Sequence, residues 1–202
     1  LDEPPGIVSG WRNWYNRWHG DPGDPVSVIL TSDPLANNHS PEDVWLDRSD
    51  RHYKECFPGK VHAICNLEKY SFDKLPTNHK RNIRKSSDLE VSVVTSQEEA
   101  VRLVIAVYPD LILKHGITGI TAYNEEQLKL LVTTPGAVVF KTTLDGNICG
   151  VSLFYVEGDR VYYHLGPQTA LGYERQSMFQ TMHVALEFFK NLGLDRCLLG
   201  GI

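Results

Sequence analysis

The sequence predicts an α/β protein with a mixed sheet, in which an antiparallel three-strand meander is followed by a strand–helix–strand crossover. Three apolar segments, AVVFKTTL, NICGVSLFYV and RVYYHLG, indicate the meander, because turn residues at Asp145-Gly146 and Glu157-Gly158 separate them. The amphipathic segment 174–193 and the apolar run DRCLLGGI after it indicate the crossover. Since such crossovers are right-handed, we expect the last strand to lie parallel to RVYYHLG.

The composition is that of an ordinary soluble globular protein. Of the 202 residues, 42% are hydrophobic and 22% are charged. No segment approaches the run of about 18 apolar residues that a membrane span needs. The net charge of −5 argues against general coating of nucleic acid, so any anion binding is expected to be local.

The cysteines and the chain ends give expectations about setting. Cys56, Cys65, Cys149 and Cys197 form no CxxC pair, which is typical of reduced thiols rather than of a zinc site or a disulfide framework, and we expect no bound metal. No signal peptide is recognisable, so the expected compartment is the cytoplasm. The chain starts at Leu1 and stops at LLGGI, inside an expected strand, which suggests a fragment of a longer protein.

The first part of the chain is expected to contain helices and short strands. Three tryptophans at helical spacing in residues 11–18 predict an amphipathic helix docked on a core, with base stacking as the alternative. VSVILTS predicts a buried strand, residues 40–56 predict a second helix, and VHAICNL predicts another strand.

A dense positive cluster follows in HKRNIRKSSD, residues 79–88. Without Lys80, Arg81, Arg84 and Lys85, 16 Lys and Arg remain against 25 Asp and Glu. On a helix these four side chains form one stripe, because residues four apart share a face. Either solvent tolerates their repulsion or an anion offsets it, so a solvated helix face and a phosphate site both stay open.

The remaining helices carry start and stop signals. After the expected strand LEVSVVT, Ser96 and Glu99 form a capping-box pattern, and the helix that follows is expected to bend or break at Pro109. Asn124 opens a further short helix. The long C-terminal helix is expected to end before Gly193, with its apolar stripe in the core.

This order of elements resembles that of GNAT-type N-acyltransferases. KRNIRKSSDLEVSVV resembles the arginine-rich helix and following strand of the FemAB-like branch, and VYYHLGPQ with ERQSMFQTMHVALEFFKNLGLDRCLLGGI resembles its strand, long helix and closing strand. The likeness covers roughly residues 60–202. It implies an acyltransferase, with 58–202 as a GNAT-like domain that is incomplete at its C-terminus. It also implies that 1–57 is the end of a preceding domain or an N-terminal extension.

The resemblance also implies the co-substrates. No tightly bound cofactor is expected; the donor would be an acyl-CoA or an aminoacyl-tRNA, so tRNA is a possible partner, and the acceptor a small-molecule or peptide amine. The candidate donor-binding residues are Gly166, Gln168, Gly172, Gln176 and Ser177, and the candidate phosphate contacts are Lys80, Arg81, Arg84 and Lys85. The loop lacks the second glycine usual in CoA-binding relatives, and Glu174 would repel a pyrophosphate, which disfavours acyl-CoA.

Acyl transfer to an amine needs a base, donors for the developing oxyanion and a proton for the leaving group. The resemblance implies that RVYYHLG and CLLGG splay apart, so that the backbone N–H of Leu165 or Gly166 faces the donor carbonyl. His164 is the first candidate for the base, because its reference pKa of about 6.5 suits neutral pH, although it could be a core histidine. Tyr163, on the opposite face of the strand, is the candidate acid or substrate contact, and only one of the two faces is expected to line the cleft. His115 is a weaker candidate.

A second hypothesis is a non-catalytic GNAT-fold module that binds a phosphorylated ligand. The altered donor loop favours it, whereas the strand VYYHLG with its possible acid and base favours the enzyme.

Overall fold

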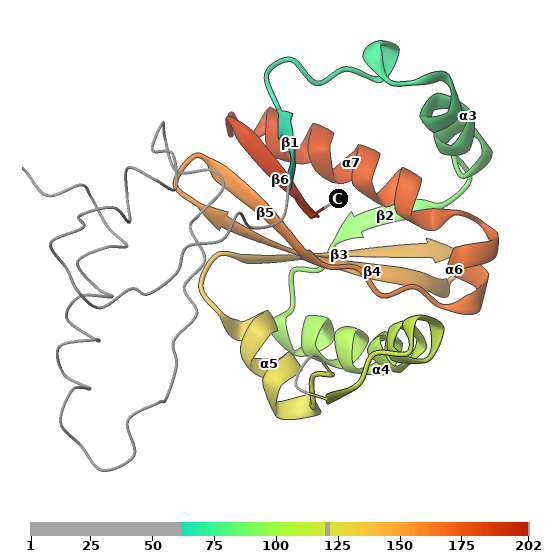
Figure 1. Ribbon diagram of the computed structural model, residues 1–202, viewed down its shortest axis with the longest axis vertical. Helices are drawn as coiled ribbons and strands as arrows, with labels where there is room; N and C mark the ends of the chain where they lie inside the picture. Colours follow the sequence, from blue (N-terminus) through green and yellow to red (C-terminus); the bar gives the residue numbers. More distant parts are fainter. Residues whose placement is uncertain (1–61, 120–121, 202) are drawn as a thin grey trace, which may run out of the picture. The chain divides into compact units, whose positions relative to one another are not determined.

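A six-stranded mixed sheet with helices on both faces forms the part of the protein that the computed structural model describes, residues 62–119 and 122–201 (Figure 1). The helices expected at 11–18 and 40–56, the strand VSVILTS and the preceding domain at 1–57 lie outside these residues.

The sheet has the strand order β1-β6-β5-β4-β3-β2. Its strands are β1 (His62–Asn66), β2 (Glu90–Val93), β3 (Ala137–Leu144), β4 (Asn147–Glu157), β5 (Arg160–Leu165) and β6 (Arg196–Gly201). Neighbouring strands are antiparallel except β5 and β6, which are parallel. This confirms the meander β3-β4-β5 and the crossover from β5 to β6.

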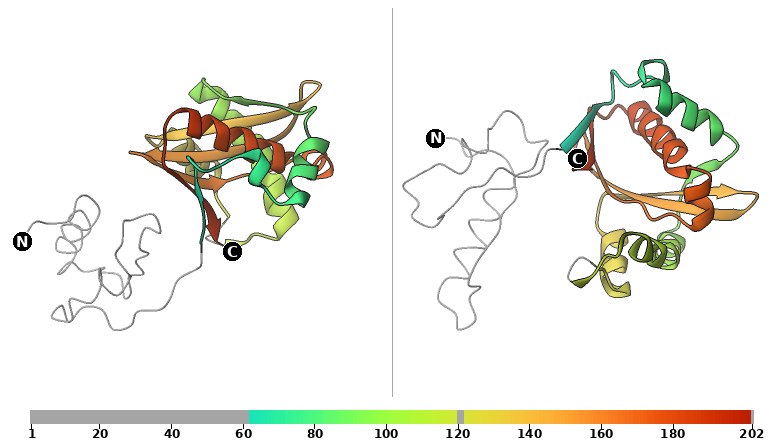
Figure 2. Two further views of the ribbon diagram at one scale, coloured as in Figure 1. Left: turned by 90° about the horizontal axis from the view of Figure 1, so that it is seen from above. Right: turned by 45° about the vertical axis from the view of Figure 1, so that its right-hand side comes forward.

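The helices divide between the two faces of the sheet. They are the 3₁₀ helix η1 (Phe72–Lys74) and the α-helices α3 (Thr77–Lys85), α4 (Gln97–His115), α5 (Glu125–Thr133), α6 (Ala170–Glu174) and α7 (Ser177–Asn191). Helix α7 covers one face with α3 packed outside it, and α4 and α5 cover the other, as both Figure 1 and Figure 2 show.

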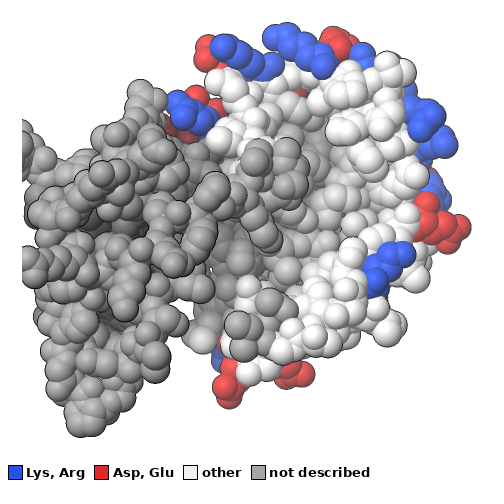
Figure 3. Space-filling view, viewed as in Figure 1, with Lys and Arg blue, Asp and Glu red and all other residues white. Residues whose placement is uncertain are grey.

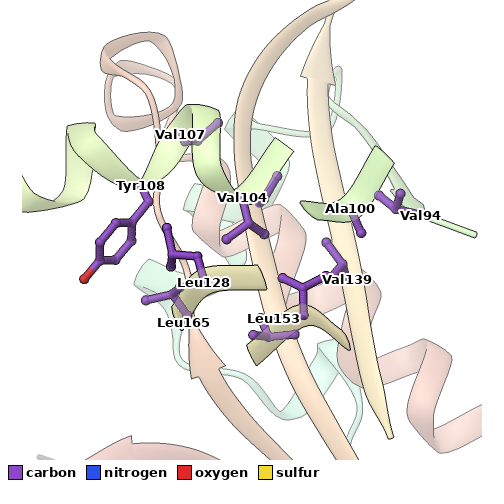
Figure 4. Packing of buried hydrophobic residues seen from close by; sticks show 11 residues of the cluster. Val94, Ala100, Val104, Val107, Tyr108, Leu128, Val139, Leu153 and Leu165 are labelled. Carbon is purple, nitrogen blue, oxygen red and sulfur yellow. The ribbon is translucent and has the colours of Figure 1, made fainter. Parts of the chain in front are cut away.

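Each face has its own hydrophobic core, because successive strand residues point to opposite sides. Toward α4 and α5, the side chains of Val104, Leu128 and Leu153 converge with those of other buried apolar residues (Figure 4). Toward α7, Phe154 and Phe189 are fully buried and pack against each other with a centroid distance of 5.2 Å.

Pro109 does not interrupt α4, which runs unbroken from Gln97 to His115. The expected interruption there was wrong, and the alternative, a bend at Pro109, stays a prediction. The ring of Pro109 lies on the exposed side of the helix, while Val107 and Tyr108 before it are buried. Burial of the apolar face on both sides of the proline holds the helix together, although one backbone hydrogen bond is lost.

The cap signals in the sequence were largely correct. Asn124 and Gln127 form a complete capping box at the start of α5. Ser96 accepts the N–H of Glu99 at the start of α4, but the Glu99 carboxylate bonds Lys141 of β3 at 2.7 Å instead of returning to the cap. Gly193, with φ of 79°, follows the end of α7 as expected.

The connection between β5 and α7 is not a simple loop, because it contains the short helix α6. The long helix begins at Ser177, three residues later than the amphipathic pattern suggested. The break between α6 and α7 lies at Gln176, which adopts a left-handed conformation with φ of 53°.

Candidate active site

The parallel strands β5 and β6 pair along only part of their length. Pairing joins Arg160, Val161 and Tyr162 with Arg196, Cys197 and Leu198, and β6 then continues against β1, where Gly201 pairs with His62. We call the place where pairing ends, after Tyr162 and Leu198, the β5–β6 fork. The expected splay of the two strands is therefore present.

A β-bulge lies in β5 directly beyond the last pair of the fork. On the β4 side Phe154 pairs with Tyr163 and Leu153 with Leu165, so His164 is the extra residue. A bulge redirects the side chains and amides around it, and bulges are common beside active sites. Here it places Leu165 in the core beneath α4 and α5 and leaves His164 exposed.

The Gly166 N–H points away from β4. Val151 N–H donates to Pro167 O at 3.0 Å and Thr169 N–H to Cys149 O at 2.9 Å, so these are hydrogen-bonded pairs. Hydrogen-bonded and non-bonded pairs alternate in antiparallel strands, and Gly166 therefore stands in a non-bonded position, while Leu165 turns its N–H toward β4. No acceptor within residues 62–119 and 122–201 takes the Gly166 N–H.

The Tyr163 hydroxyl lies against Gly166. A Cβ added to Gly166 would collide with the Tyr163 oxygen, so the close approach requires glycine. Among the described residues the one hydrogen-bond partner of this hydroxyl is the Met178 sulfur of α7, at 3.9 Å, which is a weak acceptor. Burial, with a smaller effect of Tyr173, raises the pKa of Tyr163 to about 12. The phenol is therefore protonated and available to donate.

The His164 ring lies on the opposite face of the sheet from Tyr163. Its neighbours are the rings of Tyr155 on β4, at a centroid distance of 5.4 Å, and Tyr123 before α5, at 6.3 Å. Desolvation lowers the pKa of His164, so the ring is neutral near pH 7. A neutral, partly exposed imidazole can accept a proton.

A chain of buried hydroxyl groups anchors the loop after β5. Ser177 Oγ donates to Gln168 Oε1 at 2.9 Å, Thr181 Oγ1 donates to Ser177 O at 2.9 Å, and the hydroxyls of Thr181 and Thr142 are hydrogen-bonded. All four residues are buried. Gln168 and Ser177 therefore bind each other, and this bond fixes the start of α7 relative to Gly166.

The other donor-loop candidates have local structural partners. Gly172 N–H donates to the Thr169 hydroxyl, and a Cβ at Gly172 would collide with the Cys149 carbonyl. Gln176 N–H donates to Tyr173 O at 3.2 Å. These amides are engaged within the loop, so a ligand pyrophosphate would have to displace existing hydrogen bonds there.

The cations of α3 lie outside the first turns of α7, where His79 packs edge-on against Phe179. Arg81, Arg84 and Lys85 are exposed, whereas the Lys80 ammonium donates to the Asp73 carbonyl at 3.1 Å. Figure 3 shows Lys and Arg side chains along the margin of the molecule where Figure 1 draws α3. The stripe therefore presents three exposed cations rather than four, and one of them, Arg84, lies over the Phe72 ring with its guanidinium carbon 5.4 Å from the ring centroid.

The weaker candidate, His115, contacts α6 rather than a residue of the fork. It ends α4 and contacts the Tyr173 hydroxyl of α6 through Nε2 at 3.3 Å.

Within the described ranges, no cluster of three or more His, Cys, Asp or Glu could hold a metal ion. None of the helices that the structure describes is long and apolar enough to cross a membrane.

Sequence reasoning missed the residues that surround the candidates. Tyr123 and Tyr155 lie beside His164, and Thr142 and Thr181 support Ser177. Thr142 could have been noticed, because a hydroxyl in the middle of a buried strand requires a partner. The bulge at His164 has no local sequence signal.

Comparison with known proteins rests on structure alone, since no protein-family profile and no curated protein sequence matches the chain. FemX matches 70% of this chain with a TM-score of 0.60 at 10% identity. The chain has a FemAB-like fold. The expected resemblance to FemAB-like proteins is confirmed at the level of the fold.

Two further structures share this fold. One is the C-terminal domain (DUF2156) of an Agrobacterium fabrum protein described as a lysylphosphatidylglycerol synthetase, with a TM-score of 0.56 and 15% identity over 70% of this chain. The other is L-PGS from Bacillus licheniformis, with a TM-score of 0.54 and 12% identity over 70%. The chain spans about half the length of these structures: 52% of FemX, 46% of the first and 45% of the second.

Proposed function

We propose that this FemAB-like domain is an N-acyltransferase that moves an aminoacyl group from an aminoacyl-tRNA to an amine by direct attack. The β5–β6 fork carries the proposal. It combines a backbone N–H turned away from β4 at Gly166 with a protonated hydroxyl beside it at Tyr163. Such donors stabilise an oxyanion and protonate a leaving group, and no covalent nucleophile or tightly bound cofactor is required.

The roles of the residues follow from these positions. The Gly166 N–H would stabilise the oxyanion that forms on the donor carbonyl. The Tyr163 hydroxyl would give its proton to the leaving oxygen of the ribose. His164, neutral at pH 7 and on the other face of β5, would take the proton of the attacking amine.

Two observations favour an aminoacyl-tRNA over an acyl-CoA. The amides of Gly172 and Gln176 are already hydrogen-bonded in the donor loop, so a pyrophosphate would depend on the first amides of α7 alone. Helix α3 instead exposes Arg81 and Arg84, whose guanidinium groups match phosphate oxygens. The name lysylphosphatidylglycerol synthetase likewise describes an aminoacyl product.

Binding of radiolabelled tRNA to the 202-residue chain tests the donor. Filter binding would be measured with bulk aminoacyl-tRNA, with deacylated tRNA and in competition with acetyl-CoA, at several salt concentrations. We expect aminoacyl-tRNA to bind more tightly than deacylated tRNA, and affinity to fall with salt. In Arg81→Ala/Arg84→Ala the slope of log affinity against log salt should decrease by about 2.

The matched control is Arg102→Ala/Lys129→Ala, which removes two exposed cations from α4 and α5 on the other face of the sheet. It should leave the slope unchanged. If acetyl-CoA displaces the tRNA and the displacement persists at high salt, the donor is an acyl-CoA rather than an aminoacyl-tRNA. An equal decrease of the salt slope in both double variants would contradict the proposal. Absence of binding by either donor would also contradict it and favour a non-catalytic module.

A further inference from the structure

A cavity of about 420 Å³ opens between α4 and α5, on the face of the sheet opposite α7. Its size is within the range of about 300–1,000 Å³ usual for small-molecule sites. Its walls are mainly apolar and aromatic, formed by Ile105, Tyr108, Ile112, Leu113, Tyr123 and Leu128. Leu113 is 85% exposed, so the cavity has an apolar entrance at the surface.

Pro109 also lines this cavity, together with Ile105 one turn before it in α4. In a helix the N–H of residue 109 would donate to the carbonyl of Ile105, one turn earlier. Proline has no N–H and its ring pushes that carbonyl aside. Since both residues line the cavity, an apolar wall contains one carbonyl that lacks its usual helical donor.

Two backbone donors at the other end of the cavity are already used. Asn124 N–H donates to the Gln127 side chain at 2.9 Å, and Tyr123 N–H donates to the Tyr108 hydroxyl at 3.1 Å. Glu125, which also lines the cavity, adds carboxylate acceptors. A ligand complementary to these acceptors is therefore apolar and carries a donor.

Tyr123 connects the cavity to the fork. Its ring forms part of the wall and lies 6.3 Å from the His164 ring and 5.9 Å from that of Tyr108, measured between centroids. Movement of Tyr123 on binding would change the surroundings of His164.

We propose that this cavity binds a small aromatic or aliphatic molecule with one N–H or O–H donor, which bonds the Ile105 carbonyl and is sensed by His164 through Tyr123. The site is separate from the fork and does not depend on the transferred group.

Indole and 1-methylindole provide a matched pair of probes, because they share one aromatic body and only indole has an N–H. Calorimetric titration of the 202-residue chain should show saturable binding, with indole about tenfold tighter, the effect expected of one hydrogen bond. In Pro109→Ala the restored backbone N–H bonds Ile105, so the two probes should bind equally. Equal affinities in the original chain, or a preference that persists in Pro109→Ala, would overturn the proposal.

Two further variants locate the probe. Leu113→Asp should weaken both probes without unfolding the chain, because Leu113 is exposed, whereas Leu192→Asp, at an exposed leucine beyond α7, should weaken neither. Histidine-ring NMR signals should shift for His164 on indole binding and not for His183 of α7. Unchanged binding in Leu113→Asp, or a shift of His183 alone, would place the probe elsewhere.

Discussion

The contact between Gly166 and Tyr163 is the closest approach in the candidate site. Gly166→Ala places a methyl group against the Tyr163 hydroxyl, and we expect a loss of about 1–3 kcal/mol in the free energy of unfolding. In a Tyr163→Phe background, where the hydroxyl is absent, the same change should cost about 1 kcal/mol less. Urea denaturation of the four proteins measures this coupling; an additive result would show that the hydroxyl does not lie against Gly166.

The raised pKa of Tyr163 predicts a loss of stability at high pH. In the unfolded chain the phenol ionises near pH 10, whereas in the folded protein it keeps its proton to about pH 12. The folded state therefore binds more protons between these values, and the free energy of unfolding falls as pH rises through this window, by up to about 2.7 kcal/mol. Urea denaturation from pH 8 upward should show a steeper fall than in Tyr163→Phe. Parallel curves would contradict a buried phenol.

His164 should impose an acidic limb on the transfer rate. Because desolvation lowers its pKa, protonation inactivates the proposed base only below its ordinary value of about 6.5. The rate of donor consumption should fall as pH decreases through that lower value, and His164→Gln should reduce it about a hundredfold and remove the limb. His79→Gln on α3 is the control and should keep the original profile. A limb that survives in His164→Gln would assign the base to another group.

Between elements, the hydroxyl pair of Thr142 and Thr181 joins β3 to α7. Thr181→Val leaves the Thr142 hydroxyl buried without this partner, so we expect a loss of about 1–3 kcal/mol in the free energy of unfolding. Thr142→Val/Thr181→Val removes both groups and should cost less than the sum of the single changes. Thermal denaturation of the three variants measures this, and strict additivity would contradict a direct hydrogen bond.

The elements that the sequence predicted correctly carry local signals. The strands of the meander are short apolar segments between clear turns, and Asn124 and Ser96 mark helix starts. Whether α4 continues through Pro109 depends instead on how well the apolar face around it is buried. The bulge at His164 depends on pairing with β4. Neither can be deduced from neighbouring residues, because tertiary packing overrides local preference.

The same distinction applies to the candidate site. Tyr163 and His164 were candidates because they lie in a recognisable strand, and Leu165 or Gly166 because the resemblance to FemAB-like proteins implies an oxyanion donor at the end of that strand. That Gly166 rather than Leu165 turns its N–H away from β4 required the register of the pair, and the division of Tyr163 and His164 between two faces required the bulge. Exposure of the α3 cations was predictable from their spacing. The hydrogen bond from the Lys80 ammonium to the Asp73 carbonyl was not.

At the scale of the whole molecule, the FemAB-like fold brings two distant parts of the chain to one side of the sheet. Helix α3 packs against α7, and α7 begins where the loop after the fork ends. A polyanionic donor bound along α3 would thus be directed toward the start of α7. This arrangement links the basic cluster of the sequence to the proposed oxyanion donor.

The most direct test of the account follows the Gly166 amide in the 202-residue chain with isotope-labelled glycine. Puromycin, which resembles the aminoacylated end of tRNA, and acetyl-CoA would be added in separate NMR titrations. We predict that puromycin moves the Gly166 N–H signal, which is identified by its disappearance in Gly166→Ala, downfield in a saturable manner, and that the shift is smaller in Tyr163→Phe. If neither compound moves Gly166 while other glycines respond, the fork is not where the acyl group binds.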